Sequence, residues 1–146
     1  MKKIINTPNA PAPIGPYNQA ILSNNVLYLS GQIPLDPSSM KLIEGSLEDE
    51  TTRVMENLKA VLEAAKMTFE NVVKTSIFLS DMKNFNTVNE IYGAYFKEAT
   101  APARETVEVA SLPKYVRVEI SMIASLWVFM NVLFPIDLHG TEPIGL

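Results

Sequence analysis

The chain has 146 residues, a formal net charge of −4 at pH 7, no cysteine and one histidine. This length fits one domain and leaves no room for two. The absence of cysteine excludes disulfides and thiolate ligands, and the single histidine, His139, leaves a zinc site almost without ligands, so neither a metal nor another cofactor is expected. Lys and Arg form no basic stripe, which argues against DNA or RNA bound through phosphates.

Apolar residues are abundant for a chain of this length, at 47% of the sequence against 19% charged residues. A lone domain of this composition would expose more apolar surface than solubility favours, so we expect self-association. The first residues, MKKIINTPNAPAPIGPY, resemble neither a signal peptide nor a transit peptide. A cytoplasmic location is therefore expected.

The first half of the chain predicts an extended segment, a strand and a helix. Prolines at positions 8, 11, 13 and 16 hold the first residues extended. Residues 25–33 (NVLYLSGQI) are rich in β-branched and apolar residues and predict a strand. After a loop, Ser46 is placed as an N-cap with Asp49 at the third helical position, and apolar residues at helical spacing predict a helix to about Ala65.

The second half predicts a strand, a helix and two further strands. Residues 72–79 (VVKTSIFL) form the strand, and apolar residues spaced by three or four predict a helix from near Asn84 or Asn86 to Phe96. Two runs of alternating residues then flank Leu112-Pro113, which we interpret as a β-hairpin. The order indicates an α+β fold with both helices on one face of the sheet, so the other face needs a partner.

In the predicted hairpin, alternation places Arg104, Thr106 and Glu119 on one polar face, with Arg104 and Glu119 near each other. The Arg104 guanidinium suits bidentate binding of a small carboxylate, and the alternative is a structural ion pair with Glu108 or Glu119. Glu119 suits a general base or a water-positioning group; the alternative is an ion pair with Arg117 or Lys114.

Four motifs occur in one order along the chain. They are Ile14-Gly15-Pro16-Tyr17, Ser30-Gly31-Gln32-Ile33-Pro34, Thr87-Val88-Asn89, and the segment 101–124, APARETVEVASLPKYVRVEISMIA. Over residues 12–124 this pattern resembles the RidA family, also called YjgF/YER057c/UK114 or L-PSP.

The resemblance implies a chorismate-mutase-like fold, with a mixed β-sheet and two helices on one face. Three subunits would pack their sheets into a central barrel, with a cleft at each subunit boundary. It implies a metal-free deaminase that hydrolyses enamine and imine intermediates, such as 2-aminoacrylate through 2-iminopropanoate, to the 2-keto acid and ammonia. The partners would be small 2-imino and 2-keto carboxylic acids.

By the same resemblance, Arg104 binds the substrate carboxylate and Glu119 lies near the substrate amine or the water. Tyr17 would direct its phenol into the cleft, where the alternative is ordinary packing. The rest of the pocket would comprise Ser30, Gly31, Asn89 and Thr106, and the alternative for Asn89 is a surface position on its helix. Many relatives have cysteine at the position of Thr106 and an acidic residue at that of Ser121, which puts thiol-dependent regulation and fine substrate preference in doubt.

The resemblance divides the chain into a domain, residues 1–124, and an atypical apolar C-terminal extension, residues 125–146. The run 126–134 (LWVFMNVLF) is too short to span a bilayer. We expect it to continue or flank the last strand and pack against the oligomer; a partner-binding role or a non-native extension are the alternatives. Two rival functions remain, an L-PSP-type endoribonuclease and a non-catalytic small-carboxylate-binding or chaperone-like trimer.

Overall fold

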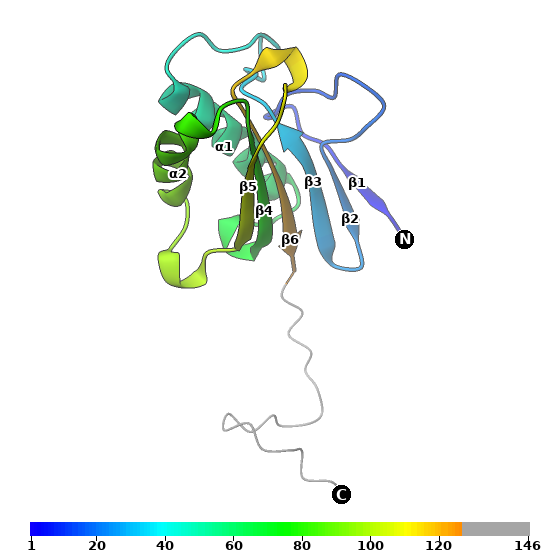
Figure 1. Cartoon of the computed structure of the whole chain (residues 1–146). Helices are drawn as coiled ribbons and strands as arrows, with labels where there is room; N and C mark the ends of the chain where they lie inside the picture. Colours follow the sequence, from blue (N-terminus) through cyan, green and yellow to red (C-terminus); the bar gives the residue numbers. More distant parts are fainter. Residues whose placement is uncertain (127–146) are drawn as a thin grey trace, which may run out of the picture.

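A computed structural model describes residues 1–126, which form one six-stranded mixed sheet with two α-helices on one of its faces (Figure 1). The strand order is β1-β2-β3-β6-β4-β5, with all pairs antiparallel except β4 and β5. The expected α+β arrangement is confirmed. The elements are β1 Lys3–Ile5, β2 Ala20–Ser23, β3 Val26–Gln32, α1 Leu47–Ala64, β4 Val72–Leu79, α2 Phe85–Gly93, β5 Ala103–Glu108 and β6 Val118–Ser125.

Helix α1 begins where the sequence predicts. The Ser46 hydroxyl accepts a hydrogen bond from the Asp49 N–H, and the Asp49 carboxylate accepts one from the Ser46 N–H, which completes a capping box. One side of α1 is fully buried at Val54, Leu58 and Leu62. The predicted apolar stripe therefore packs on the sheet.

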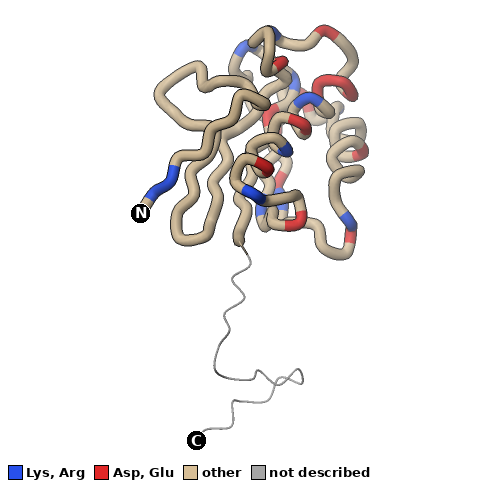
Figure 2. The backbone as a smooth tube through the Cα atoms, turned by 180° about the vertical axis from the view of Figure 1, so that it is seen from behind, with Lys and Arg blue, Asp and Glu red and all other residues tan. Residues whose placement is uncertain are grey.

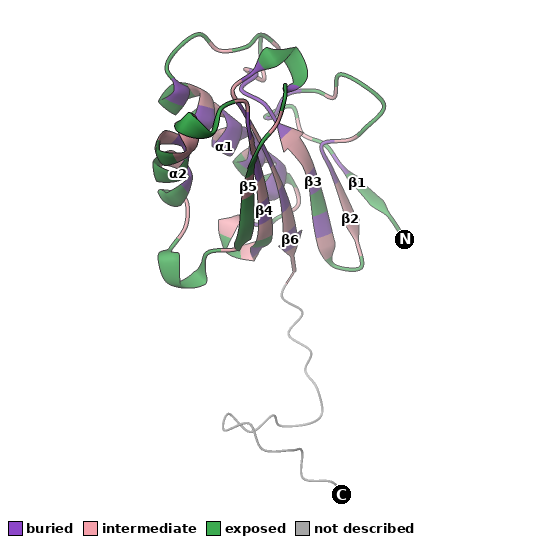
Figure 3. Cartoon of the chain, viewed as in Figure 1, coloured by how far each residue is buried: buried purple, intermediate pink, exposed green. Residues whose placement is uncertain are grey.

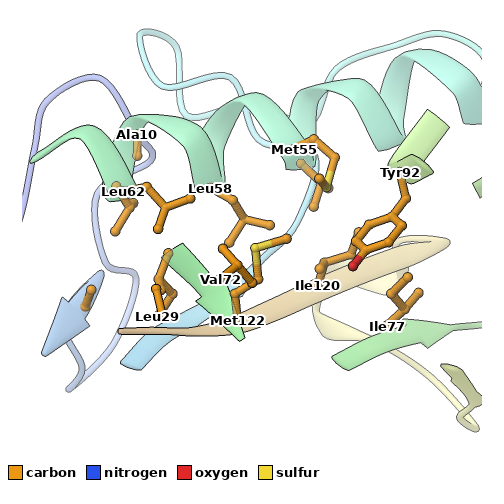
Figure 4. Packing of buried hydrophobic residues seen from close by; sticks show 14 of the residues in the cluster. Ala10, Leu29, Met55, Leu58, Leu62, Val72, Ile77, Tyr92, Ile120 and Met122 are labelled. Atoms are coloured by element: carbon orange, nitrogen blue, oxygen red, sulfur yellow. The ribbon is translucent and has the colours of Figure 1, made fainter. Parts of the chain in front are cut away.

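The core lies between the helices and one face of the sheet (Figure 4). Met55, Leu58 and Leu62 of α1 meet Leu29, Ile120 and Met122 of the central strands, and Tyr92 of α2 closes one end. Figure 3 shows the alternation along β3, where buried Leu27 and Leu29 flank exposed Tyr28. The two faces of the sheet therefore differ in burial, as the helices cover only one.

Strands β1 and β2 were not predicted. Asn24 and Asn25 both have positive φ, 51° and 63°, and join β2 to β3 in a two-residue hairpin turn, with Ser23 paired to Val26. The sequence analysis began its first strand at residue 25 and did not identify this turn. The segment before β2 is held by Gln19, which is 2% exposed and donates to the carbonyl oxygens of Thr7, Ala10 and Pro11.

The predicted hairpin is wrong. Strand β5 pairs in parallel with β4, and β6 lies on the other side of β4, between β4 and β3. The connection, residues 109–117, crosses the end of β4, where the Val109 N–H donates to Leu79 O and the Ser80 N–H donates to Arg117 O. Its Leu112 and Val116 are buried against Ile33 and Leu35, so this connection is a packed structure rather than a tight turn.

Within residues 1–126, neither helix has the length and hydropathy that crossing a membrane requires. Strand β6 ends at Ser125, and the Leu126 N–H donates to the carbonyl oxygen of Asn25. The predictions for the extension after residue 126, and His139, lie outside the described residues.

Candidate functional site

The seven predicted site residues fall into two groups. Tyr17, Ser30, Gly31 and Glu119 line a cavity of about 320 Å³. Asn89, Arg104 and Thr106 line a shallow depression between α2 and β5. One protomer therefore does not bring all seven together.

The cavity lies where the end of β3 meets the start of β6. Its wall is uncharged except for Glu119; the other lining residues within the described part of the chain are Pro11, Ala12, Ile14, Tyr17, Gln19, Ser30, Gly31, Gln32, Ile33, Leu35 and Pro113. Burial raises the pKa of Glu119 above its ordinary value. A carboxyl group in such surroundings can take up a proton more readily than one in water.

Gly31 lies directly against Glu119. A Cβ added at position 31 would overlap Oε1 of Glu119 and would lie 3.0 Å from its Cδ. The glycine therefore makes room for the carboxylate, and it does so without needing a left-handed backbone, since no positive φ occurs there. Any larger residue at this position would have to move the Glu119 side chain.

Tyr17 and Ser30 are held by hydrogen bonds to the proline-rich segment. The Tyr17 hydroxyl accepts from the Ile14 N–H at 3.2 Å, and its side chain is 45% exposed at the cavity. The Ser30 hydroxyl donates to Asn18 O at 2.6 Å, so its proton is already used and the oxygen remains as an acceptor. Within residues 1–126 the tyrosine hydroxyl, by contrast, donates to no acceptor, so its proton is available.

Arg104 faces α2. Its Nη1 donates to Asn89 Oδ1 at 2.7 Å, and its Cζ lies 5.8 Å from the centre of the Phe85 ring and 5.1 Å from that of Tyr92. Among residues 1–126, the buried Oγ1 of neighbouring Thr106 has no hydrogen-bond partner. The sequence analysis used the apolar residues of this segment only to predict a helix. The spacing of Phe85, Asn89 and Tyr92 is the signal that places all three on one side of that helix.

The structural alternatives proposed for Arg104 and Glu119 do not hold. No carboxylate among residues 1–126 forms an ion pair with Arg104. Glu108 accepts a hydrogen bond from the Met82 N–H instead, and Glu119 lies at the cavity. Arg117 pairs with Glu50 at 2.9 Å and not with Glu119. Both predicted site residues therefore keep their charges free of such ion pairs within the part of the chain that the structure describes.

Arg104 and Glu119 also do not share a face of the sheet, which corrects the prediction. Arg104 pairs across the ladder with Thr75 and points with it toward α2. Glu119 lies between Val118 and Ile120, whose side chains are buried under the helices, so it points to the uncovered face. The cause is the register of the sheet: Arg104 pairs with Thr75 and Glu119 pairs with Phe78, and residues 75 and 78 of β4 point to opposite faces.

The acidic side chains of the described residues do not cluster into a metal site. Within positions 1–126, no three or more His, Asp or Glu side chains gather closely enough to hold a metal ion.

The fold and the two groups define a class: an α+β protein with a half-covered mixed sheet, one carboxylate in an uncharged cavity and one arginine without an acidic partner in the described residues. The sequence profile of a family described as endoribonuclease L-PSP matches residues 7–126. The chain belongs to this family, which is the RidA family of the sequence analysis.

Similar proteins agree with this assignment. A RutC family protein of Synechocystis is 58% identical over 125 residues, which cover 85% of this chain and 96% of that protein. The human 2-iminobutanoate/2-iminopropanoate deaminase is 47% identical over 124 residues, covering 85% and 90%. The crystal structure of E. coli TdcF with bound serine superposes with a TM-score of 0.79 at 39% identity, covering 85% of this chain and 98% of that one.

Proposed function

We propose that the protein hydrolyses small 2-imino acids, such as 2-iminopropanoate, to the 2-keto acid and ammonia, without a metal. The observation that carries the proposal is the pair of complementary groups, an arginine with no acidic partner in residues 1–126 and a carboxylate of raised pKa in an uncharged cavity. The name of the human relative and the amino acid bound to TdcF support a substrate of this size and charge.

Arg104 provides the anchor in this proposal. A guanidinium binds a carboxylate through two parallel hydrogen bonds, which fixes the orientation of the substrate. The buried Thr106 hydroxyl, unpartnered among the described residues, and the Thr106 backbone amide lie beside it as further donors. The carboxylate is thereby held while the imine carbon is presented for attack.

Glu119 provides the base. It takes a proton from a water that attacks the imine carbon, which forms a C–O bond and gives a carbinolamine. The nitrogen takes this proton as the C=N double bond opens. Glu119 then moves the carbinolamine hydroxyl proton to the nitrogen, so that the C–N bond breaks and ammonia leaves as the C=O bond forms. The Tyr17 hydroxyl donates to the oxygen that the water adds to the imine carbon, and the Ser30 oxygen accepts from the imine N–H. Gly31 leaves the space that the Glu119 carboxylate occupies.

The complete site requires two subunits in this proposal, because one protomer places Arg104 and Glu119 on opposite faces. The uncovered face has an apolar row across four strands, formed by the cross-strand neighbours Ile4, Ile21, Tyr28 and Ile123. Ile4 and Tyr28 are each about half exposed, at 53% and 51%. Burying this row against other copies yields the expected homotrimer, in which Arg104 of one subunit meets the Glu119 cavity of the next.

The ribonuclease alternative has less support. Figure 2 shows Lys and Arg interspersed with Asp and Glu, while the backbone from residue 4 to residue 35 has no charged residue. Such a distribution offers no continuous track for phosphates. RNA cleavage that survives Arg104→Ala would mark a contaminant or a separate site.

The test is release of pyruvate and ammonia from 2-iminopropanoate generated in situ. Wild-type protein is expected to accelerate this release, and Glu119→Gln, which keeps the shape and removes the base, is expected to slow turnover by about two orders of magnitude or more. Binding of a 2-keto acid should persist in this variant. Equal turnover in both proteins would remove Glu119 from the mechanism.

A further inference from the structure

Three residues of α2 contact the Arg104 side chain from the same side. Phe85, Asn89 and Tyr92 are separated by four and three positions, which places them on one face of the helix. The guanidinium carbon lies 5.8 Å and 5.1 Å from the two ring centres, within the range of a cation–π interaction. The Asn89 amide oxygen accepts from Nη1 at 2.7 Å.

The Tyr92 ring is fixed by its own contacts. Its side chain is 4% exposed, and its hydroxyl donates to Oγ1 of Thr75 at 3.0 Å. Thr75 is also the ladder partner of Arg104, so the ring is tied to the strand next to the one that carries the arginine. Burial raises the pKa of Tyr92, which keeps the hydroxyl protonated as a donor.

The three contacts orient the guanidinium without neutralising it. Arg117 shows the contrast, since its Nε is paired with the Glu50 carboxylate at 2.9 Å. Two rings and an amide oxygen are neutral, and Arg104 remains exposed, with one hydrogen bond among the described residues. Its remaining N–H groups are free to bind an incoming anion.

We infer that Phe85, Asn89 and Tyr92 are positioning residues, which hold the Arg104 guanidinium in one orientation for a substrate carboxylate. The inference rests on the proposed function and assigns Asn89 a role different from direct substrate binding. Without the three contacts, a long exposed side chain would sample many rotamers, and binding would have to order it first.

A purely structural role for the same residues is the competing explanation, because Tyr92 also belongs to an aromatic cluster. Phe96 is the matched control: its ring lies 4.7 Å from that of Tyr92 and 5.3 Å from that of Phe69, and it has no cation–π contact with Arg104. Phe96→Leu therefore loosens the cluster and leaves the contacts to Arg104 in place.

The first measurement needs no ligand. In the NMR spectrum of the wild-type protein, the Arg104 side-chain protons, assigned by comparison with Arg104→Lys, are expected to show ring-current shifts. These shifts should persist in Tyr92→Phe and Phe96→Leu and collapse in Phe85→Leu and Tyr92→Leu. Random-coil Arg104 shifts in the wild type would overturn the inference.

The second measurement is the affinity for 2-oxobutyrate. Phe85→Leu and Tyr92→Leu are expected to raise its Kd roughly threefold to thirtyfold, while Tyr92→Phe and Phe96→Leu stay within about twofold of the wild type. Asn89→Asp separates the effect on stability from the effect on ligand binding. The new carboxylate pairs with Arg104, so the melting temperature should not fall, yet the Kd should rise at least about tenfold because the anion site is occupied.

The outcomes separate this inference from the proposed function. Unchanged Kd in Phe85→Leu, Tyr92→Leu and Asn89→Asp would overturn the positioning role while leaving imine hydrolysis intact. A wild-type protein that binds no 2-keto acid would contradict the proposed function, and the ligand-free shifts would still decide whether the helix orients Arg104.

Discussion

At the scale of single residues, Glu119 combines a proposed catalytic role with a cost to stability. The carboxylate lies in an uncharged cavity, and burial raises its pKa. The charged form is therefore less favoured in the folded protein than in the unfolded chain. The same desolvation that makes the group a better base disfavours its charged state.

The pH dependence of activity and stability follows from this shift. The base must be deprotonated, so kcat/KM is expected to fall with decreasing pH at a higher pH than an ordinary glutamate, with a pKa of about 4.3, would give. As pH rises from the unfolded pKa through the raised folded pKa, the wild type should lose stability relative to Glu119→Gln. pH–rate profiles measure the change in kcat/KM, and paired melting curves of the wild type and Glu119→Gln measure the change in stability. A wild type that becomes more stable relative to Glu119→Gln over that pH interval would contradict the raised pKa.

Gly31 gives a second test of how Glu119 is placed. Gly31→Ala should push the carboxylate away from its position, because the added Cβ overlaps Oε1. We expect kcat to fall by about tenfold or more, and the melting temperature to change little, because the end of a flexible side chain can move. Gly93→Ala is the control, since a methyl group added at Gly93 would meet no atom within 4 Å. Equal kcat in the two variants would show that the contact does not matter.

Arg104→Lys tests the anchor. Lysine keeps the charge and loses the planar fork, so we expect 2-oxobutyrate binding to weaken at least about tenfold and turnover to fall with it. Stability should change by less than about 1 kcal/mol, as for an exposed charge. Titration beside melting curves separates the two quantities, and equal affinity in both proteins would refute the anchor role.

At the scale of elements, the N-terminal segment forms part of the cavity because Gln19 holds it. The Gln19 side chain accepts from the Thr7 N–H and donates to three carbonyl oxygens of the segment. Pro11 and Ala12 of this segment line the cavity. A buried amide in this position satisfies backbone groups that would otherwise be unpaired.

Gln19→Leu should therefore loosen the segment without removing the sheet. We expect a loss of about 1–3 kcal/mol, faster amide exchange in residues 7–19, and a lower kcat/KM. Amide exchange in β6 serves as the internal control, and the β6 amides should stay better protected than those of residues 7–19 in the variant as in the wild type. Unchanged exchange in the segment would show that its prolines hold it without Gln19.

Local patterns in the sequence predicted the elements better than their arrangement. The capping box at Ser46 and the alternation along β6 depend on neighbouring residues, and both are confirmed. The pairing of β5 depends on where residues 109–117 pack, and burial of Leu112 and Val116 beside Ile33 is a long-range contact that no local period indicates. For the same reason the sequence analysis wrongly placed the candidate residues Arg104 and Glu119 on one face of the sheet.

The family resemblance supplied the candidate site residues, and the structure shows what they contact. Asn89 was predicted as a pocket residue, yet its amide oxygen bonds Arg104. Gly31 was predicted to bind substrate, yet the space it leaves is filled by Glu119. Contacts between side chains from separate elements are fixed by tertiary packing, so a sequence motif alone does not reveal them.

At the scale of the whole molecule, one face of the sheet packs on the helices and the other is left uncovered. The helices cover one face (Figure 1). The other face has the apolar row and the Glu119 cavity, and residues 4–35 carry no charge (Figure 2). The sequence analysis predicted that this face needs a partner. The proposed mechanism gives that prediction a chemical reason, because Arg104 and Glu119 of one protomer lie on opposite faces of the sheet and a second copy would supply the missing half of the site.

Mixing of inactive subunits tests this account most directly. Arg104→Met and Glu119→Gln proteins, each expected to be a trimer by light scattering, are denatured together, refolded and assayed for pyruvate release from 2-iminopropanoate. In a random equal mixture, about a quarter of the interfaces combine an intact Arg104 with an intact Glu119, so about a quarter of wild-type activity should return. A mixed trimer no more active than its parents would contradict a site shared between subunits.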